Sequence, residues 1–362
     1  MEAKKYLNAL NKINGVGPQK LRLLLNYFAS PEKAWTAIAS ELKASGIGEA
    51  ISEKIVTERI GIDPQAEWER LEQEKIKMIV WGDPEYPRLL KEIPGAPYII
   101  YMKGEIDLNG APMISIVGSR KYTNYGAQVA HAFARDLAAA GLTVVSGMAI
   151  GIDAIAHRGA LDAGGQTIAV LGGSLDDGNI YPRVNFNLSR EIIENGALLS
   201  DFPVETPAGI PGNFPARNRL IAGLSLGTLV IEAGEKSGTL ITSGLALEFN
   251  RNIFAVPGSV FSPQSFGTNE LIKRGAKVVT CVKDILDELD LSTGREKAPA
   301  AAKIPDNADE KILLKILSPD PLHIDKISKM AKLDTSVVSS SLAMMEIKGW
   351  VKNIGGQNYI LL

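Results

Sequence analysis

Short hydrophobic runs alternate with longer amphipathic stretches between residues 113 and 281. Each run ends in small or polar residues, which is typical of a strand buried inside a parallel sheet. We expect strands at residues 113–118, 142–146, 166–171, 197–200, 228–233, 252–256 and 277–281. We expect helices between them at Tyr125–Ala140, Ala154–Ala163, Asn185–Glu194, Asn218–Gly223, Leu240–Asn250 and Asn269–Arg274. This alternation over short connections predicts an α/β fold with a doubly wound, mostly parallel sheet.

The first 62 residues have the pattern of short helices. Two segments, Leu10–Leu21 and Leu42–Ile51, each carry a glycine–hydrophobic–glycine turn between helical stretches. In helix-hairpin-helix (SAM-like) domains such turns expose backbone N–H groups that bind DNA phosphates. They also serve as plain helix connections, and the sequence leaves both interpretations open. Residues 63–111 are a connector with one expected strand, Lys75–Trp81, and a proline-rich stretch, Pro84–Pro97, that excludes a long helix.

The C-terminal part is separated from the sheet region by a stretch with the composition of a linker, residues 291–306. Three expected helices follow at Ile312–Leu317, Ile324–Met330 and Ser336–Ile347, and then a hairpin with a turn at Gly355-Gly356. This is the order of a winged-helix domain. The third helix contains no arginine, whereas a helix that reads the major groove normally offers Arg, Asn or Gln. Protein contact or a scaffolding role is therefore favoured over DNA reading.

These patterns divide the chain into an N-terminal helical domain (1–62), a sheet domain with its connector (63–290), a linker (291–306) and a winged-helix domain (307–362).

Composition limits the class of protein. Hydrophobic residues make up 45% of the 362 residues, and no run approaches the roughly 20 apolar residues of a membrane span. The single cysteine, Cys281, excludes an internal disulfide and a thiolate metal cage. We therefore expect a cytoplasmic protein without a membrane partner. Since the net charge is −2, a nucleic-acid partner requires a local basic patch.

Candidate chemistry lies where the expected strands end, because ligands of open α/β sheets bind beyond the carboxyl ends of the strands. After the first strand, Gly118 permits close approach of a ligand, Ser119 offers a hydroxyl, and Arg120 offers a planar fork suited to phosphate. Arg183 follows a proline on a later loop and can reach the same crevice. The segment Arg217-Asn218-Arg219 opens a helix, where the helix dipole disfavours cations. An anionic partner would remove that conflict.

A second phosphate-type turn is Lys236-Ser237-Gly238-Thr239, at the start of an expected helix. It resembles a P-loop superficially. Glu235 stands where a P-loop has the glycine before its lysine, so the Walker spacing fails.

Two further patterns are interpreted as structural. Asp153 and His157 are four residues apart and share a helix face. A helix cap and a histidine with satisfied hydrogen bonds are favoured over an acid–base or metal pair, so we expect no metal and no cofactor. The segment Gly223–Gly227 matches G-x-S-x-G, but its serine follows a helix and precedes a strand, which reverses the order of a nucleophile elbow.

Seven short motifs follow one another through the sheet domain: GSR (118–120), SGMAIGID (146–153), AH (156–157), YPRVN (181–185), FPARNR (214–219), SGTLIT (237–242) and PG (257–258). The pattern continues through Gly267, Asn269–Ile272 and Gly275-Ala276. Together they resemble the DNA-processing protein A family, DprA, also called Smf. The resemblance implies an extended Rossmann-like fold that binds single-stranded DNA without cutting it. It further implies protection of incoming strands in natural transformation, loading of the RecA recombinase, and a homodimer.

The resemblance also implies roles for individual residues. Arg120 and Arg183 are expected to contact DNA, and Arg217, Arg219 and the Ser-Gly-Thr turn are expected to line one pocket. The full expected DNA-binding set is Gly118, Ser119, Arg120, Gly147, Arg183, Asn185, Phe214, Arg217, Asn218, Arg219, Lys236, Ser237, Gly238 and Thr239. The dimer is expected to form through residues 266–279, with Asn269, Ile272 and Val278 in contact. One departure is Ser200-Asp201, where the family usually has Ser-Glu.

The physical chemistry of this set agrees with the resemblance, because arginines and glycine turns favour backbone phosphates over base identity. Bases can also stack on Tyr122, Tyr181 or Phe214. Two alternatives stay open. Nucleotide phosphoribohydrolases carry PGGxGT followed by a catalytic Glu, but Ser237–Thr239 lacks the paired glycines and Ile241 stands at the position of the Glu. A winged-helix transcription regulator is disfavoured by the uncharged third helix.

Overall fold

The computed structural model describes residues 2–210, 212–291, 305, 307–318 and 320–361. The chain forms two compact units, residues 1–295 and 296–362. The linker expected at residues 291–306 lies almost wholly outside the described residues. Among the described residues, no helix is both long enough and apolar enough to cross a membrane.

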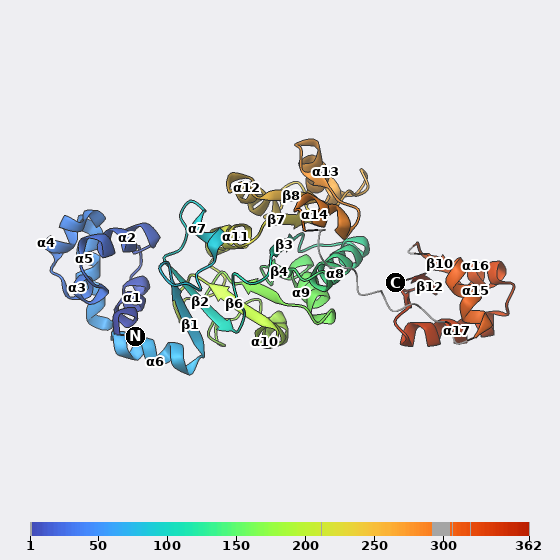
Figure 1. Ribbon diagram of the computed structural model, residues 1–362, viewed down its shortest axis with the longest axis horizontal. Helices are drawn as coiled ribbons and strands as arrows, with labels where there is room; N and C mark the ends of the chain where they lie inside the picture. The colour runs from blue at the N-terminus through green and yellow to red at the C-terminus, as the bar shows by residue number, and fades with distance from the viewer. Residues whose placement is uncertain (1, 211, 292–304, 306, 319, 362) are drawn as a thin grey trace. The chain divides into compact units, whose positions relative to one another are not determined.

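The first unit is built on a sheet of nine strands (Figure 1). Their bounds are β1 (Ile76–Val80), β2 (Ile99–Gly104), β3 (Met113–Val117), β4 (Thr143–Ser146), β5 (Thr167–Val170), β6 (Gly196–Ser200), β7 (Gly227–Val230), β8 (Asn252–Ala255) and β9 (Lys277–Val278). The order across the sheet is β1-β2-β6-β5-β4-β3-β7-β8-β9. The pairs β1–β2 and β2–β6 are antiparallel and all others are parallel. The expected doubly wound, mostly parallel sheet is confirmed.

One strand escaped the sequence pattern. β2 lies inside the stretch that was expected to be a connector, directly after Pro94 and Pro97. The prolines hid a hydrophobic run that pairs antiparallel with β1 and β6 and extends the sheet at this edge.

Helices cover both faces of the sheet because its strands are hydrophobic on both sides. One face packs on α8 (Asn124–Ala139), α9 (Ile152–Asp162), α10 (Phe186–Glu194) and α14 (Val282–Glu288). The other packs on α7 (Arg88–Lys91), α11 (Asn213–Leu224) and α12 (Thr239–Glu248). Neighbouring residues show the division: Val144 points into the first core and Val145 into the second. Near the β8 and β9 edge lies α13 (Phe266–Lys273), and η3 (Arg183–Asn185) and η4 (Pro263–Ser265) are single turns.

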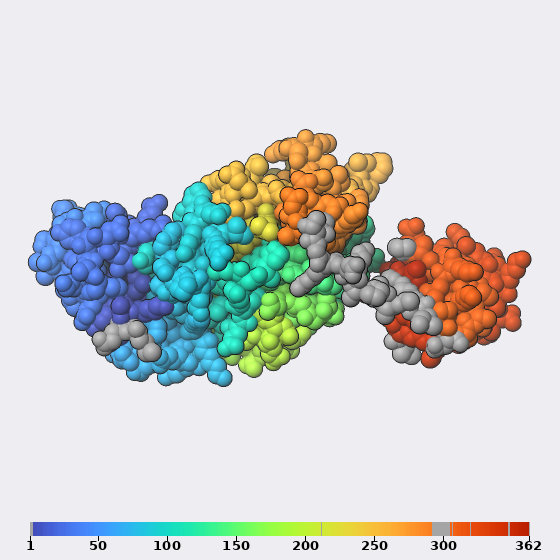
Figure 2. Space-filling view, in the orientation of Figure 1, coloured from blue at the N-terminus to red at the C-terminus, as the bar shows by residue number. Residues whose placement is uncertain are grey.

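The N-terminal helices share a hydrophobic core with one face of the sheet. They are α1 (Glu2–Lys12), α2 (Pro18–Tyr27), α3 (Pro31–Thr36), α4 (Ala39–Leu42), α5 (Glu49–Glu58) and α6 (Pro64–Gln73), with short turns η1 (Lys43–Ile47) and η2 (Arg59–Gly61). Leu10 and Leu24 belong to the same buried cluster as Tyr101 of β2 and Leu198 of β6. In Figure 2 the blue helical residues abut the cyan residues of the sheet edge.

The second unit contains three helices and a small sheet. Its elements are α15 (Ala308–Ile316), β10 (Leu322–His323), α16 (Ile324–Ala331), α17 (Thr335–Ile347), β11 (Val351–Asn353) and β12 (Asn358–Leu361). The expected winged-helix order of helices and hairpin is confirmed, and β10 adds a short third strand beside β12. Lys348 fastens the end of α17 to the buried carboxylate of Glu310 on α15 at 2.6 Å.

The sheet order creates one topological switch point. From β3 the chain moves through β4 and β5 to β6, then returns through α11 to β7 on the opposite side of β3. The loops after β3 and β7 therefore turn away from each other and leave a crevice beyond the carboxyl ends of these strands.

Candidate nucleic-acid interface

A cavity of about 510 Å³ lies at the switch point between β3 and β7. Three segments form most of its wall: Gly118–Lys121 after β3, the first turn of α11, and the turn that precedes α12. Its lining includes Gly118, Ser119, Arg120, Phe214, Arg217, Asn218, Lys236, Ser237, Gly238 and Thr239, all members of the expected DNA-binding set. Strand ends far apart in sequence are thus brought to one place.

The rim of this cavity is cationic. Arg120, Lys121 and Lys236 are exposed there, and within the described part of the chain none of them forms an ion pair. The first turn of α12 opens into the same space, where Thr239 N–H donates to Ser237 Oγ at 3.3 Å. A helix N-terminus and unpaired cations both favour an anion.

An aromatic ledge borders the cavity. The rings of Tyr181 and Phe214 are 5.9 Å apart and inclined by 46°, and the Arg120 guanidinium lies 5.7 Å from the centre of the Phe214 ring. A smaller hollow next to the cavity is lined by Arg120, Gly147, Ile150, Tyr181, Phe214 and Arg217. Cations and aromatic faces therefore adjoin each other, as they do in sites that hold phosphates and stack bases.

Arg217 forms part of the floor of the cavity, and backbone carbonyls hold its guanidinium in place. The residue is only 5% exposed, and its Nη1 donates to Gly147 O at 2.7 Å and to Val170 O. A Cβ at Gly147 would lie 2.6 Å from Nη1, so glycine at this position leaves room for the guanidinium. Burial lowers the pKa of Arg217 to about 10, against the attraction of Asp153, so the guanidinium stays charged at neutral pH. It ties the ends of β4 and β5 together beneath the cavity.

Asp153 does not cap α9, contrary to the sequence prediction. The N-cap residue is Gly151, with φ +98°, and a Cβ there would lie 2.6 Å from Ser119 O. This close approach excludes a side chain at the cap. The carboxylate of Asp153 instead accepts the Gly147 N–H at 3.2 Å, and burial raises its pKa although Arg217 opposes the shift. Among the described residues, no cluster of three or more His, Cys, Asp or Glu is placed to hold a metal.

Two expected residues of the loop after β5 lie beside the cavity and do not line it. Arg183 is exposed, with its guanidinium 4.0 Å from the Phe186 ring centre and its Nη1 donating to Asp177 O at 2.8 Å. Asn185 donates to Met148 O at 2.9 Å and so fastens this loop to the one after β4. Arg183 follows Tyr181 of the smaller hollow by two residues and is absent from the lining of both hollows.

Arg219 points away from the cavity, which corrects the expectation that it lines the pocket with Arg217. It donates to Gly95 O at 3.1 Å and forms an ion pair with Asp201. Asp201 is the residue that stands where the family usually has Glu, so a carboxylate is present at this position despite the departure. The physical reason is helical geometry: residues two apart on a helix face nearly opposite directions, so Arg217 and Arg219 cannot share one wall.

Besides Lys121 of the rim, two residues that the motifs did not identify, Gln264 and Glu232, support the site. Gln264 lines the cavity and its Oε1 accepts the Ser119 hydroxyl at 3.1 Å. The buried Glu232, just after β7, accepts the Thr123 N–H at 2.9 Å and the Thr123 hydroxyl at 2.5 Å, which fixes the loop after β3. A charged residue at the end of a hydrophobic strand was the available signal for Glu232. No sequence signal marked Gln264.

The expected dimer residues lie at the β9 edge. Val278 is 44% exposed and Ile272 is half-buried on α13. Asn269 turns inward, donating to Gly258 O at 3.1 Å. Of the three expected dimer residues, Val278 and Ile272 therefore present apolar atoms outward.

Comparisons with known proteins identify the family. The family model "DNA recombination-mediator protein A" matches residues 77–290, and the model of the DprA winged helix domain matches residues 297–357. The chain belongs to the DprA family. The Smf protein of Synechocystis is 35% identical to it over 98% of both chains.

Two solved DprA structures are also similar. DprA of Streptococcus pneumoniae has a TM-score of 0.69 and 34% identity, covering 78% of this chain and 97% of that one. DprA of Helicobacter pylori has a TM-score of 0.54 and 32% identity, covering 59% and 95%. The H. pylori structure is described as giving the single-stranded DNA binding mode of that protein.

Proposed function

We propose that this DprA family member binds single-stranded DNA, without cutting it, in the cavity between β3 and β7. It would thereby protect incoming strands and load the RecA recombinase in natural transformation, acting as a homodimer. The observation that carries the proposal is the cationic rim of Arg120, Lys121 and Lys236 around an aromatic ledge. The single-stranded DNA binding of the H. pylori relative supports it.

The geometry favours an unpaired strand over a duplex. In a duplex the base faces are stacked on each other, whereas a single strand presents them to aromatic side chains. The ring of Tyr181 is 47% exposed beside Phe214 and is accessible to such a base. Phosphates on either side of the base would then meet the Arg120 and Lys236 side chains. Sequence preference would be weak, since these contacts read the backbone.

The cavity side chains favour binding over hydrolysis. Its carboxylate, Asp153, is buried and already accepts the Gly147 N–H. Ile241 lines the cavity at the position where a phosphoribohydrolase has its catalytic Glu. Release of free base from nucleoside monophosphates by the purified protein would instead support the hydrolase alternative.

The proposal is tested by the salt dependence of single-strand binding. Fluorescence anisotropy of a labelled oligonucleotide, titrated at several NaCl concentrations, should give a steep linear fall of log K with log salt. Arg120→Ala and Lys236→Ala should each reduce the magnitude of this slope by about 0.7, the value for one phosphate contact to a single strand. Arg135→Ala, an exposed arginine on α8 paired with Asp136, serves as the control and should keep the slope. Affinity that does not change with salt would overturn the phosphate site.

A further inference from the structure

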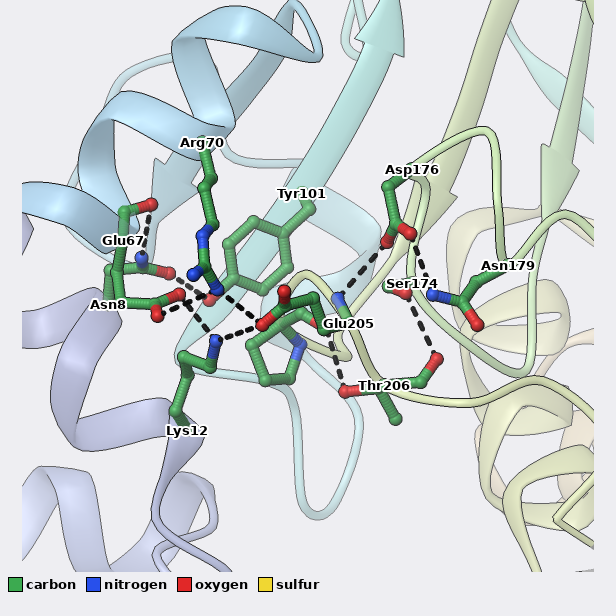
Figure 3. A network of polar contacts seen from close by, with 11 residues as sticks. Asn8, Lys12, Glu67, Arg70, Tyr101, Ser174, Asp176, Asn179, Glu205 and Thr206 are labelled. Carbon is green, nitrogen blue, oxygen red and sulfur yellow. Dashed lines mark hydrogen bonds and ion pairs between the residues drawn. The ribbon is translucent and has the colours of Figure 1, made fainter. Parts of the chain in front are cut away.

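Two chain segments carry the outer parts of the DNA site, and both are fastened to the N-terminal helices. The loop after β5, residues 172–183, ends at Tyr181 and Arg183. The segment after β6, residues 201–210, precedes α11 and Phe214. Figure 3 shows one polar network that joins these two segments to α1 and α6.

Glu205 is the centre of the network. Its carboxylate accepts from Lys12 Nζ of α1 at 3.1 Å and from Arg70 Nη1 of α6 at 2.5 Å (Figure 3). Its backbone N–H donates to Asp176 Oδ1 at 3.1 Å. The residue has φ +68°, a conformation that side-chain-bearing residues rarely adopt. Contacts around Glu205 therefore hold the backbone in a conformation that its own chain disfavours.

The two segments are also bonded directly to each other. The backbone N–H and hydroxyl of Ser174 both donate to Thr206 O, at 3.2 and 3.0 Å. Asn179 donates to Asp176 Oδ2 at 2.7 Å. Burial opposes ionisation of Asp176, but hydrogen bonds from the Glu205 N–H and Asn179 outweigh it and lower the pKa of that carboxyl.

The connection continues to Arg183. Lys103 of β2 binds Asp177 at 2.8 Å and Glu74, just after α6, at 2.9 Å. The carbonyl of Asp177 in turn accepts from Arg183 Nη1 at 2.8 Å. Arg183, an expected DNA contact, is thus held by a loop that is fastened to β2 and to the end of α6.

Ion pairs and a hydrophobic core hold the helical side of the network in place. Lys12 and Arg70 both bind the nearly buried carboxylate of Glu67, so two cations and two carboxylates balance each other. Val204, next to Glu205, is buried in the hydrophobic core that contains Leu10 of α1. The helical residues that bind Glu205 are therefore themselves held by packing and ion pairs, as support for a binding site requires.

We propose that Glu205 is a positioning residue that couples α1 and α6 to the segments carrying Tyr181, Arg183 and Phe214. The helical domain would then set the geometry of the DNA site without touching DNA. This inference rests on the proposed single-strand binding. Glu205 is absent from the lining of both hollows, so it acts through the two segments.

The test uses the full-length Glu205→Gln variant, which keeps the side-chain shape and removes its charge. We expect the Kd for a labelled single strand to rise roughly 2- to 30-fold, the range of couplings carried by remote contacts. The magnitude of the salt slope should fall by at most about 0.7, the value for one phosphate contact, because Arg183 is the cation that the two segments carry, whereas Arg120 and Lys236 lie outside them. Hydrogen exchange should become faster at the amides of Glu205 and Ser174, which lie at the two junctions.

A matched control is Glu85→Gln. The side chain of Glu85 is 54% exposed, against 55% for Glu205, and it pairs with Lys77 at 2.7 Å at the edge of the sheet. It should leave both affinity and exchange unchanged.

The outcomes separate the two proposals. Wild-type affinity and exchange in both Glu205→Gln and Arg70→Met would overturn the coupling. Tighter binding in Glu205→Gln would show that its carboxylate acts on the DNA phosphates directly, by repulsion, and would also overturn the coupling. Failure of the wild type to bind single strands would overturn the proposed function, and the exchange rates would then still decide the coupling.

Discussion

His157 is a fully buried imidazole whose protonation state follows from its hydrogen bonds. The Thr167 hydroxyl donates to Val144 O at 2.8 Å, so the His157 Nδ1, 2.7 Å from that hydroxyl oxygen, must carry the hydrogen. Among the described atoms His157 Nε2 has no partner. A second proton would place an N–H there without an acceptor. Burial, with Arg217 adding to it, lowers the pKa of His157 to about 3.

This burial predicts acid sensitivity. Between the ordinary pKa of 6.5 and the folded value of about 3, only the unfolded chain binds this proton. The free energy of unfolding should therefore fall with decreasing pH in that window, by up to about 1.4 kcal/mol per pH unit. His157→Gln should remove this part of the slope. Urea unfolding at about pH 7 and about pH 5 measures it.

Asp153 changes the free energy of unfolding with pH in the direction opposite to His157, so the wild type has to be compared with the His157→Gln variant. The pKa of Asp153 is raised by burial, so its contribution to stability weakens as pH rises above the ordinary value of 3.8. Both proteins contain Asp153, and the difference between their slopes isolates His157. Equal slopes in the two proteins would show that the imidazole is not the group that titrates.

At the scale of elements, a buried cation adds to the hydrophobic packing that joins α11 to the sheet. The Arg217 guanidinium reaches from the first turns of α11 to the carbonyls that follow β4 and end β5. Arg217→Met would remove the cation that attracts the Asp153 carboxylate and leave the two carbonyls without this donor. We expect the free energy of unfolding to fall by about 3–6 kcal/mol, since each hydrogen bond from a charged group contributes about 1.5–3 kcal/mol. Urea denaturation measures it.

Arg217→Lys distinguishes geometry from charge. An ammonium group keeps the charge but lacks the planar fork that spans two carbonyls, so stability should recover only in part. A variant as stable as the wild type, with a reduced DNA salt slope, would instead make Arg217 a direct phosphate ligand.

The same elements show how far the sequence predicts the site. Arg120 and Lys236 followed from the strand pattern, because the carboxyl ends of parallel strands meet at one edge. Arg219 did not, because its spacing from Arg217 gives no indication of which side of α11 faces the sheet. The contact of Glu205 with Lys12 spans 193 residues. No local pattern encodes a pairing between a helix and a loop that only the tertiary fold brings together.

For the whole molecule, distribution of charge matters more than its sum. The net charge is −2, yet the cations at the switch point lack carboxylate partners within the described residues, while Lys12, Arg70 and Lys103 are neutralised in the network around Glu205. Among the described residues, the cations at this rim are therefore unneutralised, unlike those of the network around Glu205. Steering of a polyanion to this rim is the expected consequence.

Assembly is the remaining property of the whole molecule. Within the described residues β9 pairs only with β8, so its outer edge is open, and Val278 there is 44% exposed. If the proposed dimer forms across this edge, Val278→Lys places a charge at its centre. The dimer dissociation constant should then rise at least about 30-fold, as for loss of an interface hot spot of 2 kcal/mol. Light scattering after size-exclusion chromatography over a range of concentrations measures it.

Ile60→Lys is the matched control, since Ile60 is 85% exposed on the η2 turn of the helical domain. It should leave the dissociation constant unchanged. Because the β3 and β7 loops lie on the other side of β8 from this edge, Val278→Lys monomers should keep the salt slope of single-strand binding. A wild type that is monomeric at every concentration would remove the dimer from the proposal and leave the DNA site intact.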